Sequence, residues 1–155
     1  MTRLSEMYKV VHVVEAADNQ AGIAGDSING GKASHIMWIV SCGALTGDAV
    51  LTVKSGAAAG TETTSETFNY RLADADTLGT GADGYGNWTT SSSLTMTAAT
   101  YDHKVLLIEM DPRTATDGQP YLTLSISAAA DVHTSSVVAV VVPRFASHDA
   151  PTVLT

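Results

Sequence analysis

The 155-residue sequence predicts an all-β fold, an antiparallel β-sandwich of jelly-roll-like form with about eight strands. Apolar and polar side chains alternate over several short segments, which is typical of strands with one solvated face. Turn sequences rich in Gly, Asn, Asp and Pro separate these segments, and no stretch combines a 3.6-residue period with helix caps. Short strands joined by polar turns indicate a sandwich or barrel, and an immunoglobulin-like sandwich is the neighbouring alternative.

Alternation is clearest in AVLTVKS at 49–55, FNYRL at 68–72 and YLTLSIS at 121–127. In FNYRL, for example, Phe68 and Tyr70 fall on one face and Asn69 on the other. Such segments are expected to be half-buried strands.

Three other segments are apolar with little or no alternation: HIMWIV at 35–40, VLLIEM at 105–110 and VVAVVV at 137–142. They are short and rich in β-branched residues, and this pattern predicts central strands that are buried on both faces. Taken in chain order, the expected strands lie near residues 8–15, 24–28 (short), 35–42, 49–55, 64–72, 92–98, 103–111, 120–128 and 136–144.

The chain is expected to form one domain, because its length permits one substantial core and no interdomain linker is visible. We divide it into an N-terminal arm at 1–8, a sandwich at 9–144 and an extended C-terminal tail at 145–155. The longest connection is 73–91, and loops of this length are often functional or mobile.

Charge limits the expected partners. The formal net charge is −8 with only 8 Lys and Arg residues, and such a surface repels nucleic acid and anionic membranes. No segment has the roughly 18 apolar residues of a membrane-spanning helix, and the N-terminus lacks the pattern of a signal peptide. We therefore expect a soluble protein made in the cytoplasm. The single cysteine, Cys42, follows an apolar run with no cationic neighbour and is expected to be a buried hydrophobic residue.

The segment LADADTLGTGADGYGNW, residues 72–88, contains a literal G-x-G-x-x-G pattern at Gly79, Gly81 and Gly84. A dinucleotide site needs a strand before this pattern and a helix directly after it, and here strand-like polar sequence follows. A calcium loop counted from Asp74 has Asp76 at its third position but lacks acidic residues at its fifth and twelfth. We therefore expect no cofactor at this loop.

The sequence predicts neither a metal site nor an enzyme. The five histidines form no H-x-H or H-E-x-x-H pair, and no G-x-S-x-G is present. In the loop, Tyr85 and Trp88 leave two interpretations open. They either stack on a sugar or hold the loop against the sandwich.

Three segments resemble small virion structural proteins of tailed bacteriophages, above all capsid decoration (cement) proteins: TGDAVLTVKSGAAAGTETTSETFNYRLA, LTMTAATYDHKVLLIEMD and YLTLSISAAADVHTSSVVAVVVPRFA. The resemblance implies a non-catalytic β-rich protein on the outer surface of the virion capsid. Its partners would be the major capsid protein and further copies of itself, with which it would form a homotrimer. A carbohydrate- or receptor-binding sandwich of a tail or fibre is the alternative. The candidate interface residues are Arg3, Tyr8, Asp83, Tyr85, Trp88, Arg144 and Phe145.

Overall fold

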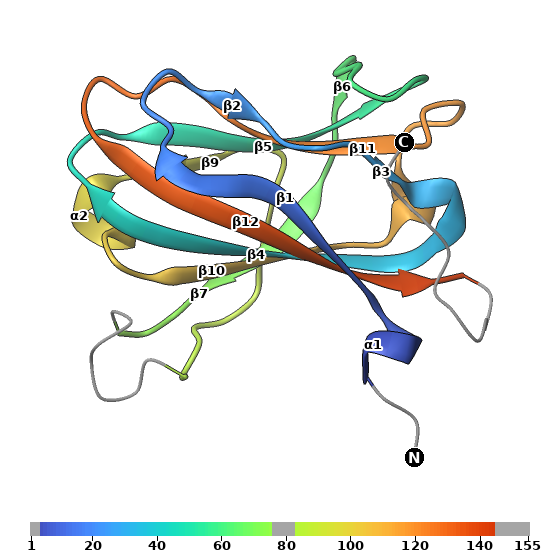
Figure 1. The fold of residues 1–155 in the computed structure, drawn as a ribbon, viewed down its shortest axis with the longest axis horizontal. Helices are drawn as coiled ribbons and strands as arrows, with labels where there is room; N and C mark the ends of the chain where they lie inside the picture. The colour runs from blue at the N-terminus through green and yellow to red at the C-terminus, as the bar shows by residue number, and fades with distance from the viewer. Residues whose placement is uncertain (1–3, 76–82, 145–155) are drawn as a thin grey trace.

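A computed structural model describes residues 4–75 and 83–144, without the side chains of Ser5 and Glu6. The described residues form two antiparallel sheets packed face to face, which confirms the predicted all-β sandwich (Figure 1). The strands are β1 (Lys9–Asp18), β2 (Ile23–Ala24), β3 (Ile28–Asn29), β4 (Ala33–Leu45), β5 (Ala49–Gly56), β6 (Thr64–Ser65), β7 (Phe68–Leu72), β8 (Thr89–Ser91), β9 (Leu94–Met96), β10 (Val105–Met110), β11 (Tyr121–Ile126) and β12 (His133–Pro143).

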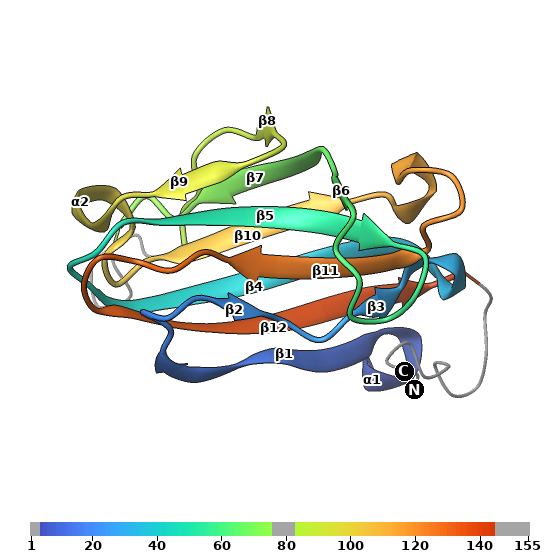
Figure 2. The same ribbon diagram turned by 90° about the horizontal axis from the view of Figure 1, so that it is seen from above.

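The first sheet, sheet A, has the strand order β1-β12-β4-β10-β7-β8. The second, sheet B, has the order β2-β11-β5-β6, with β3 also on β11 and β9 also on β5. Figure 2 looks onto sheet B, and sheet A lies behind it.

The pairing of the strands is nested. β1 pairs with β12, β2 and β3 pair with β11, β4 pairs with β10, and β5 pairs with β9. The chain is therefore one long hairpin whose two arms roll together across both sheets, which is the connectivity of a jelly roll. β6, β7 and β8 lie at the tip of this hairpin, between β5 and β9.

The core lies between the sheets. Alternate residues of the central strands point inward, as the period of two requires, and their side chains are fully buried. Trp38 and Phe68 are the largest of these, and Leu51, Leu106, Ile108, Leu122 and Leu124 pack with them.

Helical structure among the described residues is confined to short turns. These are α1 (Leu4–Met7), α2 (Ala98–Tyr101) and the 3-10 turns η1 (Gly30–Lys32) and η2 (Pro112–Thr114). One helical turn is far below the length at which an isolated helix is stable, so neighbouring structure must hold each of them. The expected N-terminal arm thus contains a helical turn, closed by the bond from the Tyr8 N–H to the Leu4 carbonyl at 3.0 Å.

The expected long loop at 73–91 is shorter in the structure, because part of it pairs. Ala73 forms a β-bridge with Tyr85, and Thr89–Ser91 forms β8 at the edge of sheet A. The sequence there, TTS, has no apolar alternation, and its pairing with β7 depends on partners that lie about twenty residues away.

Candidate interaction surfaces

Arg71 lies on the outer side of sheet A between two aromatic rings. Its guanidinium carbon is 4.9 Å from the centre of the Tyr85 ring and 4.6 Å from the centre of the Trp88 ring. Both distances are within the roughly 6 Å over which a cation and an aromatic face attract each other. Arg71 belongs to β7 and pairs with Leu107 of β10, so the stack attaches the segment 83–88 to the sheet.

Backbone hydrogen bonds hold the two ends of this loop together. The Asp74 N–H donates to the Gly84 carbonyl at 2.9 Å, and the Gly86 N–H donates to the Leu72 carbonyl at 3.0 Å. Gly84 is the third glycine of the G-x-G-x-x-G pattern, and its carbonyl therefore takes part in an extension of the pairing between the end of β7 and the segment that leads to β8. Gly79, Gly81 and Asp76 lie outside the described residues.

The loop also carries an exposed surface. Trp88 keeps 43% of its area exposed, Tyr85 is half-buried and Asp83 is exposed. The two aromatic residues thus contact the sandwich through Arg71, and Trp88 also offers part of its ring to solvent.

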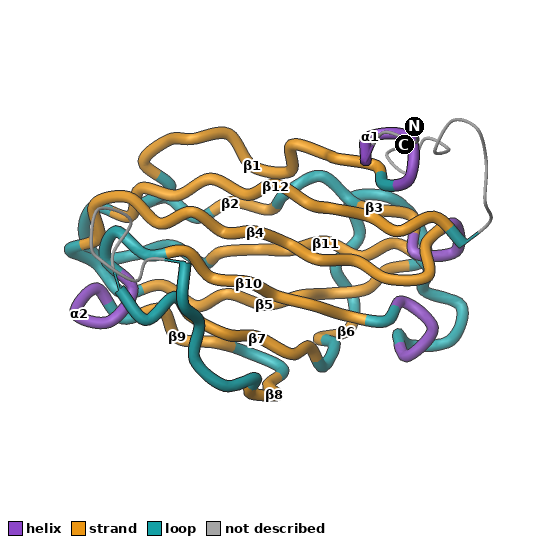
Figure 3. The backbone as a smooth tube through the Cα atoms, turned by 90° about the horizontal axis from the view of Figure 1, so that it is seen from below, coloured by secondary structure: helices purple, strands orange, loops and turns teal. Residues whose placement is uncertain are grey.

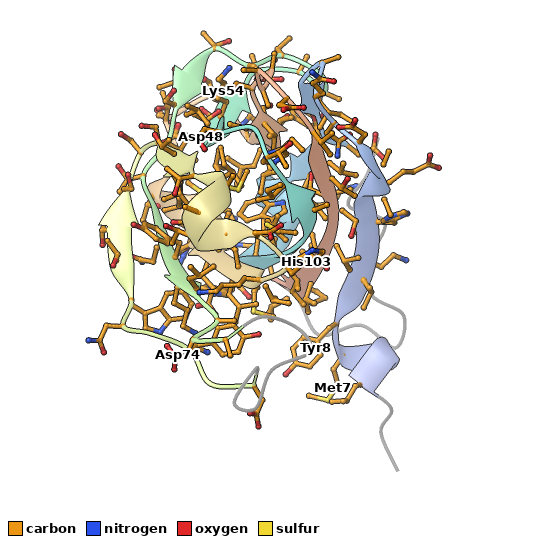
Figure 4. The ribbon with its side chains drawn as sticks, turned by 90° about the vertical axis from the view of Figure 1, so that its left-hand side faces the viewer. Met7, Tyr8, Asp48, Lys54, Asp74 and His103 are labelled. Atoms are coloured by element: carbon orange, nitrogen blue, oxygen red, sulfur yellow. The ribbon has the colours of Figure 1, made fainter. Side chains whose placement is uncertain are left out.

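The N-terminal segment is the most apolar exposed part of the described chain. Leu4, Met7 and Val10 are 73%, 47% and 61% exposed, and Tyr8 is half-buried. Figure 4 shows Met7 and Tyr8 below sheet A at one flank of the molecule, with Asp74 toward the other flank. Arg3 lies outside the described residues.

The outer side of sheet A is apolar across its centre. Residues in register on neighbouring strands share a face, and two complete rows can be followed. One row runs Val10–Val140–Met37–Glu109–Asn69, and the next runs His12–Val138–Ile39–Leu107–Arg71. We call the six apolar members of these rows the apolar face: Val10, Met37, Ile39, Leu107, Val138 and Val140.

The apolar face corrects one expectation. Unbroken apolar runs in β4, β10 and β12 predicted strands buried on both sides, but only their inward residues are uniformly buried. Met37, Ile39, Val138 and Val140 are half-buried, and Leu107 is 8% exposed. The sandwich has two layers. The segment 83–88 covers the Arg71 end of the second row, and Figure 3 shows α1 beside β1 at one end of the molecule.

Few charges accompany the apolar face. Glu109 is the one carboxylate in the two rows, and its Oε2 lies 3.1 Å from Nε2 of His35. Arg71 is held in the aromatic stack, and His12 is exposed at the β1 edge. This surface therefore carries little of the chain's negative charge.

A second surface lies at the end of the sandwich where β12 finishes. A pocket of about 400 Å³ is lined there by Gly30, Gly31, the loop 112–120 and Arg144. Arg144 is exposed, and its N–H donates to the Lys32 carbonyl at 2.8 Å. Phe145, the other candidate at this end, lies outside the described residues.

The titratable groups inside the sandwich have structural environments. Cys42 is buried in the core, and burial, with the nearby charge of Asp102, raises the pKa of its thiol to about 12. A thiol with that pKa is almost entirely protonated at neutral pH and is a poor nucleophile.

Glu66 is a buried carboxylate that the sequence analysis missed. Burial alone raises the pKa of Glu66, but donors from Ser55 and Thr116 outweigh that effect and hold the pKa below its ordinary value. The Ser55 hydroxyl lies 2.5 Å from Oε1, and the Thr116 N–H donates to the same oxygen at 2.9 Å. Glu66 thus joins β5 to the loop before β11, and nothing in the local sequence TSETF predicts this.

Two further features concern the described part of the chain only. It contains no group of three or more His, Cys, Asp or Glu residues placed to hold a metal ion. It also has no helix with the length and apolar character needed to cross a membrane.

Comparisons with known proteins gave no match of this chain to a protein-family model, a curated protein or a solved structure.

Proposed function

We propose that this protein decorates the outer surface of a bacteriophage capsid as an oligomer and stabilises the capsid lattice. In this proposal the major capsid protein and further copies of the chain, as a homotrimer, are its partners. The protein is made in the cytoplasm of the host, resides on the virion and is not an enzyme.

The observation that supports this proposal best is the apolar surface formed by the exposed N-terminal segment and the adjoining, partly exposed apolar face. Large exposed apolar patches on a soluble domain mark surfaces of interaction. Leu4 and Met7 precede β1, and Val10 belongs both to this segment and to the apolar face. The resemblance to decoration proteins suggests the capsid as the site of binding, and the apolar surface is the part of the protein that would contact the capsid.

The net charge of −8 is consistent with this role. A protein made in many copies must not aggregate before it reaches the capsid, and a net charge well away from zero favours solubility. Arg144, exposed beside a pocket, is a suitable anchor for an acidic residue of a capsid subunit.

The test is binding to purified capsids that lack the protein, with sedimentation to measure binding and calorimetry to measure the heat stability of the heads. We expect saturable binding and a higher melting temperature of the heads. Arg144→Ala should weaken binding, while Arg113→Ala, at the same pocket but engaged with Asp111 at 2.6 Å, should weaken it less. Absence of binding by the unaltered protein contradicts the proposal.

A second candidate function, binding of a carbohydrate or receptor by a tail or fibre protein, is favoured by Trp88. Its partly exposed ring lies against Arg71 and is oriented by that contact, and aromatic rings on loops commonly stack on sugars. If this function is correct, a glycan array gives specific signals that Trp88→Ala abolishes. An array without signals, together with binding to heads, selects the decoration function.

A further inference from the structure

We infer that the apolar face of sheet A is the surface through which two copies of this chain bind each other. The inference goes beyond the proposed function: a face-to-face contact is two-fold and joins two copies, whereas the homotrimer proposed above needs a separate three-fold contact. The face comprises Val10, Met37, Ile39, Leu107, Val138 and Val140, which lie in register on four neighbouring strands.

The two outer faces of the sandwich differ in character. On sheet B, the outward position Ser125 pairs with Thr52 and Ala24, and the next polar pair is Thr123 with Lys54. Lys54 also forms an ion pair with Glu62 at 2.9 Å. The outward positions of sheet B are thus mostly polar, with Val50 as an exposed exception, whereas those at the centre of sheet A are apolar.

The dimensions of the apolar face suit an interface between proteins. The rows cross β1, β12, β4, β10 and β7, which lie about 4.8 Å apart, and the rows are about 6.7 Å apart along the strands. A further pair on the same side of the sheet flanks the two rows in each direction along the strands: His35 with Val142 in one direction and Ser41 with Ser136 in the other. With these pairs included, the surface measures about 25 by 25 Å, or roughly 600 Å². A standard interface buries about 800 Å² on each partner, so the apolar face, its polar border and the neighbouring N-terminal segment together approach that size.

Charge favours a second copy as the occupant. Two chains that each carry a net charge of −8 repel each other across most approaches, and the repulsion is smallest where carboxylates are scarce. Glu109 is the sole carboxylate in the two described rows, and it already faces His35 at 3.1 Å. An apolar face without net negative charge is complementary to itself, which is what a two-fold symmetric contact requires.

The N-terminal segment extends the face beyond the edge of the sheet. Val10 begins the first row on the edge strand β1, and Met7 and Leu4 precede it in α1. All three are exposed although they are large apolar residues. A second copy laid on the apolar face covers Val10 and lies next to Met7.

The experiment measures the molar mass of the purified full chain by light scattering and its dissociation constant by sedimentation. Val140→Glu places a charge between Val10 and Met37 in the first row. The control, Thr52→Glu, adds the same charge at a half-buried outward position of sheet B. We expect the unaltered chain and the control to have a molar mass of at least twice 16.1 kDa, and Val140→Glu to dissociate at least about 100-fold more readily.

Val140→Thr guards against a variant that fails to fold, because it keeps the shape and strand propensity of valine and should weaken association about 10-fold. A strictly monomeric unaltered chain, or a Val140→Glu variant that folds and associates as tightly as the unaltered chain, overturns the inference. If the unaltered chain is monomeric and Val140→Glu loses binding to heads, the apolar face binds a capsid subunit and not a second copy. The proposed function then stands, and this inference fails. If the chain associates through the face but does not bind heads, the inference stands and the proposed function fails.

Discussion

Replacing Glu66 with Gln should destabilise the protein at neutral pH, because the Glu66 carboxylate is a buried acceptor with two donors. The Ser55 hydroxyl and the Thr116 N–H both reach Oε1, at 2.5 and 2.9 Å, and the residue is only 6% exposed. Glutamine keeps the shape of the side chain and an acceptor oxygen but removes the charge.

The expected loss follows from the strength of hydrogen bonds to charged and neutral acceptors. A hydrogen bond to a charged group contributes about 1.5–3 kcal/mol and a neutral one about 0.5–1.5 kcal/mol, so two bonds lose roughly 2 kcal/mol together. For a domain of this size, each kcal/mol corresponds to about 2–4 °C in Tm, which gives a fall of about 4–8 °C.

The pH dependence provides an independent check. The pKa of Glu66 is lower in the folded protein than its ordinary value, so its charged form stabilises the fold. That contribution is fully present above the unfolded pKa of about 4.3 and is lost as the pH falls through the folded pKa. The difference between the two proteins in free energy of unfolding should therefore be largest near neutral pH and shrink in acid.

Urea unfolding followed by circular dichroism at neutral and at acid pH measures this difference. Glu15→Gln is the matched control, since it removes the same charge from an exposed position on β1 and should change stability little. A Glu66→Gln variant as stable as the unaltered protein at neutral pH refutes the reasoning. So does a deficit that stays constant into acid.

Three further predictions concern other parts of the sandwich. Cys42 should not react with a thiol reagent at pH 8 until urea unfolds the chain, because its pKa is raised to about 12 in the core, and rapid labelling of the folded protein contradicts this. Arg71→Met should cost roughly 1–2 kcal/mol through loss of two cation–π contacts. It should also increase acrylamide quenching of Trp88, which is readable because Trp38, the other tryptophan, is fully buried; unchanged quenching argues against the stack. Leu124→Ala, at a fully buried position, should cost about 2–5 kcal/mol in urea unfolding, whereas Val50→Ala on the outer face of sheet B should cost far less; equal losses contradict the assigned core.

The strands were predictable because their side-chain pattern is a local property. The period of two in AVLTVKS, FNYRL and YLTLSIS located β5, β7 and β11, and each of the other expected segments also contains a strand. β8 was not predicted, because TTS has no apolar alternation and its pairing with β7 depends on contacts distant in the sequence. The nested order of the strands likewise depends on long-range pairing, which a strand count does not determine.

The candidate surfaces were predictable only in part. Tyr85 and Trp88 were identified from their place in a long loop, but the partner that lies between them, Arg71, was not. The position of Arg71 on the outward side of FNYRL was readable from the alternation, and the return of the loop over that side was not. Glu66 was missed because a lone glutamate between strands gives no sign of burial, which depends on Ser55 and Thr116.

The edges of sheet A are poor sites for self-association, which strengthens the argument for its face. An edge strand recruits another strand when it is long, regular and apolar. At one edge β8 has only three residues. At the other, β1 has register shifts between His12 and Val14 and again before Ala17, and the Val13 carbonyl already accepts the Asp26 N–H at 3.2 Å. Irregular pairing of this kind discourages strand addition, while the residues of the apolar face on β12, β4 and β10 stay in regular register. Contacts between copies are therefore expected through side chains of the face, and Val140→Glu should affect them more than a proline placed in β8.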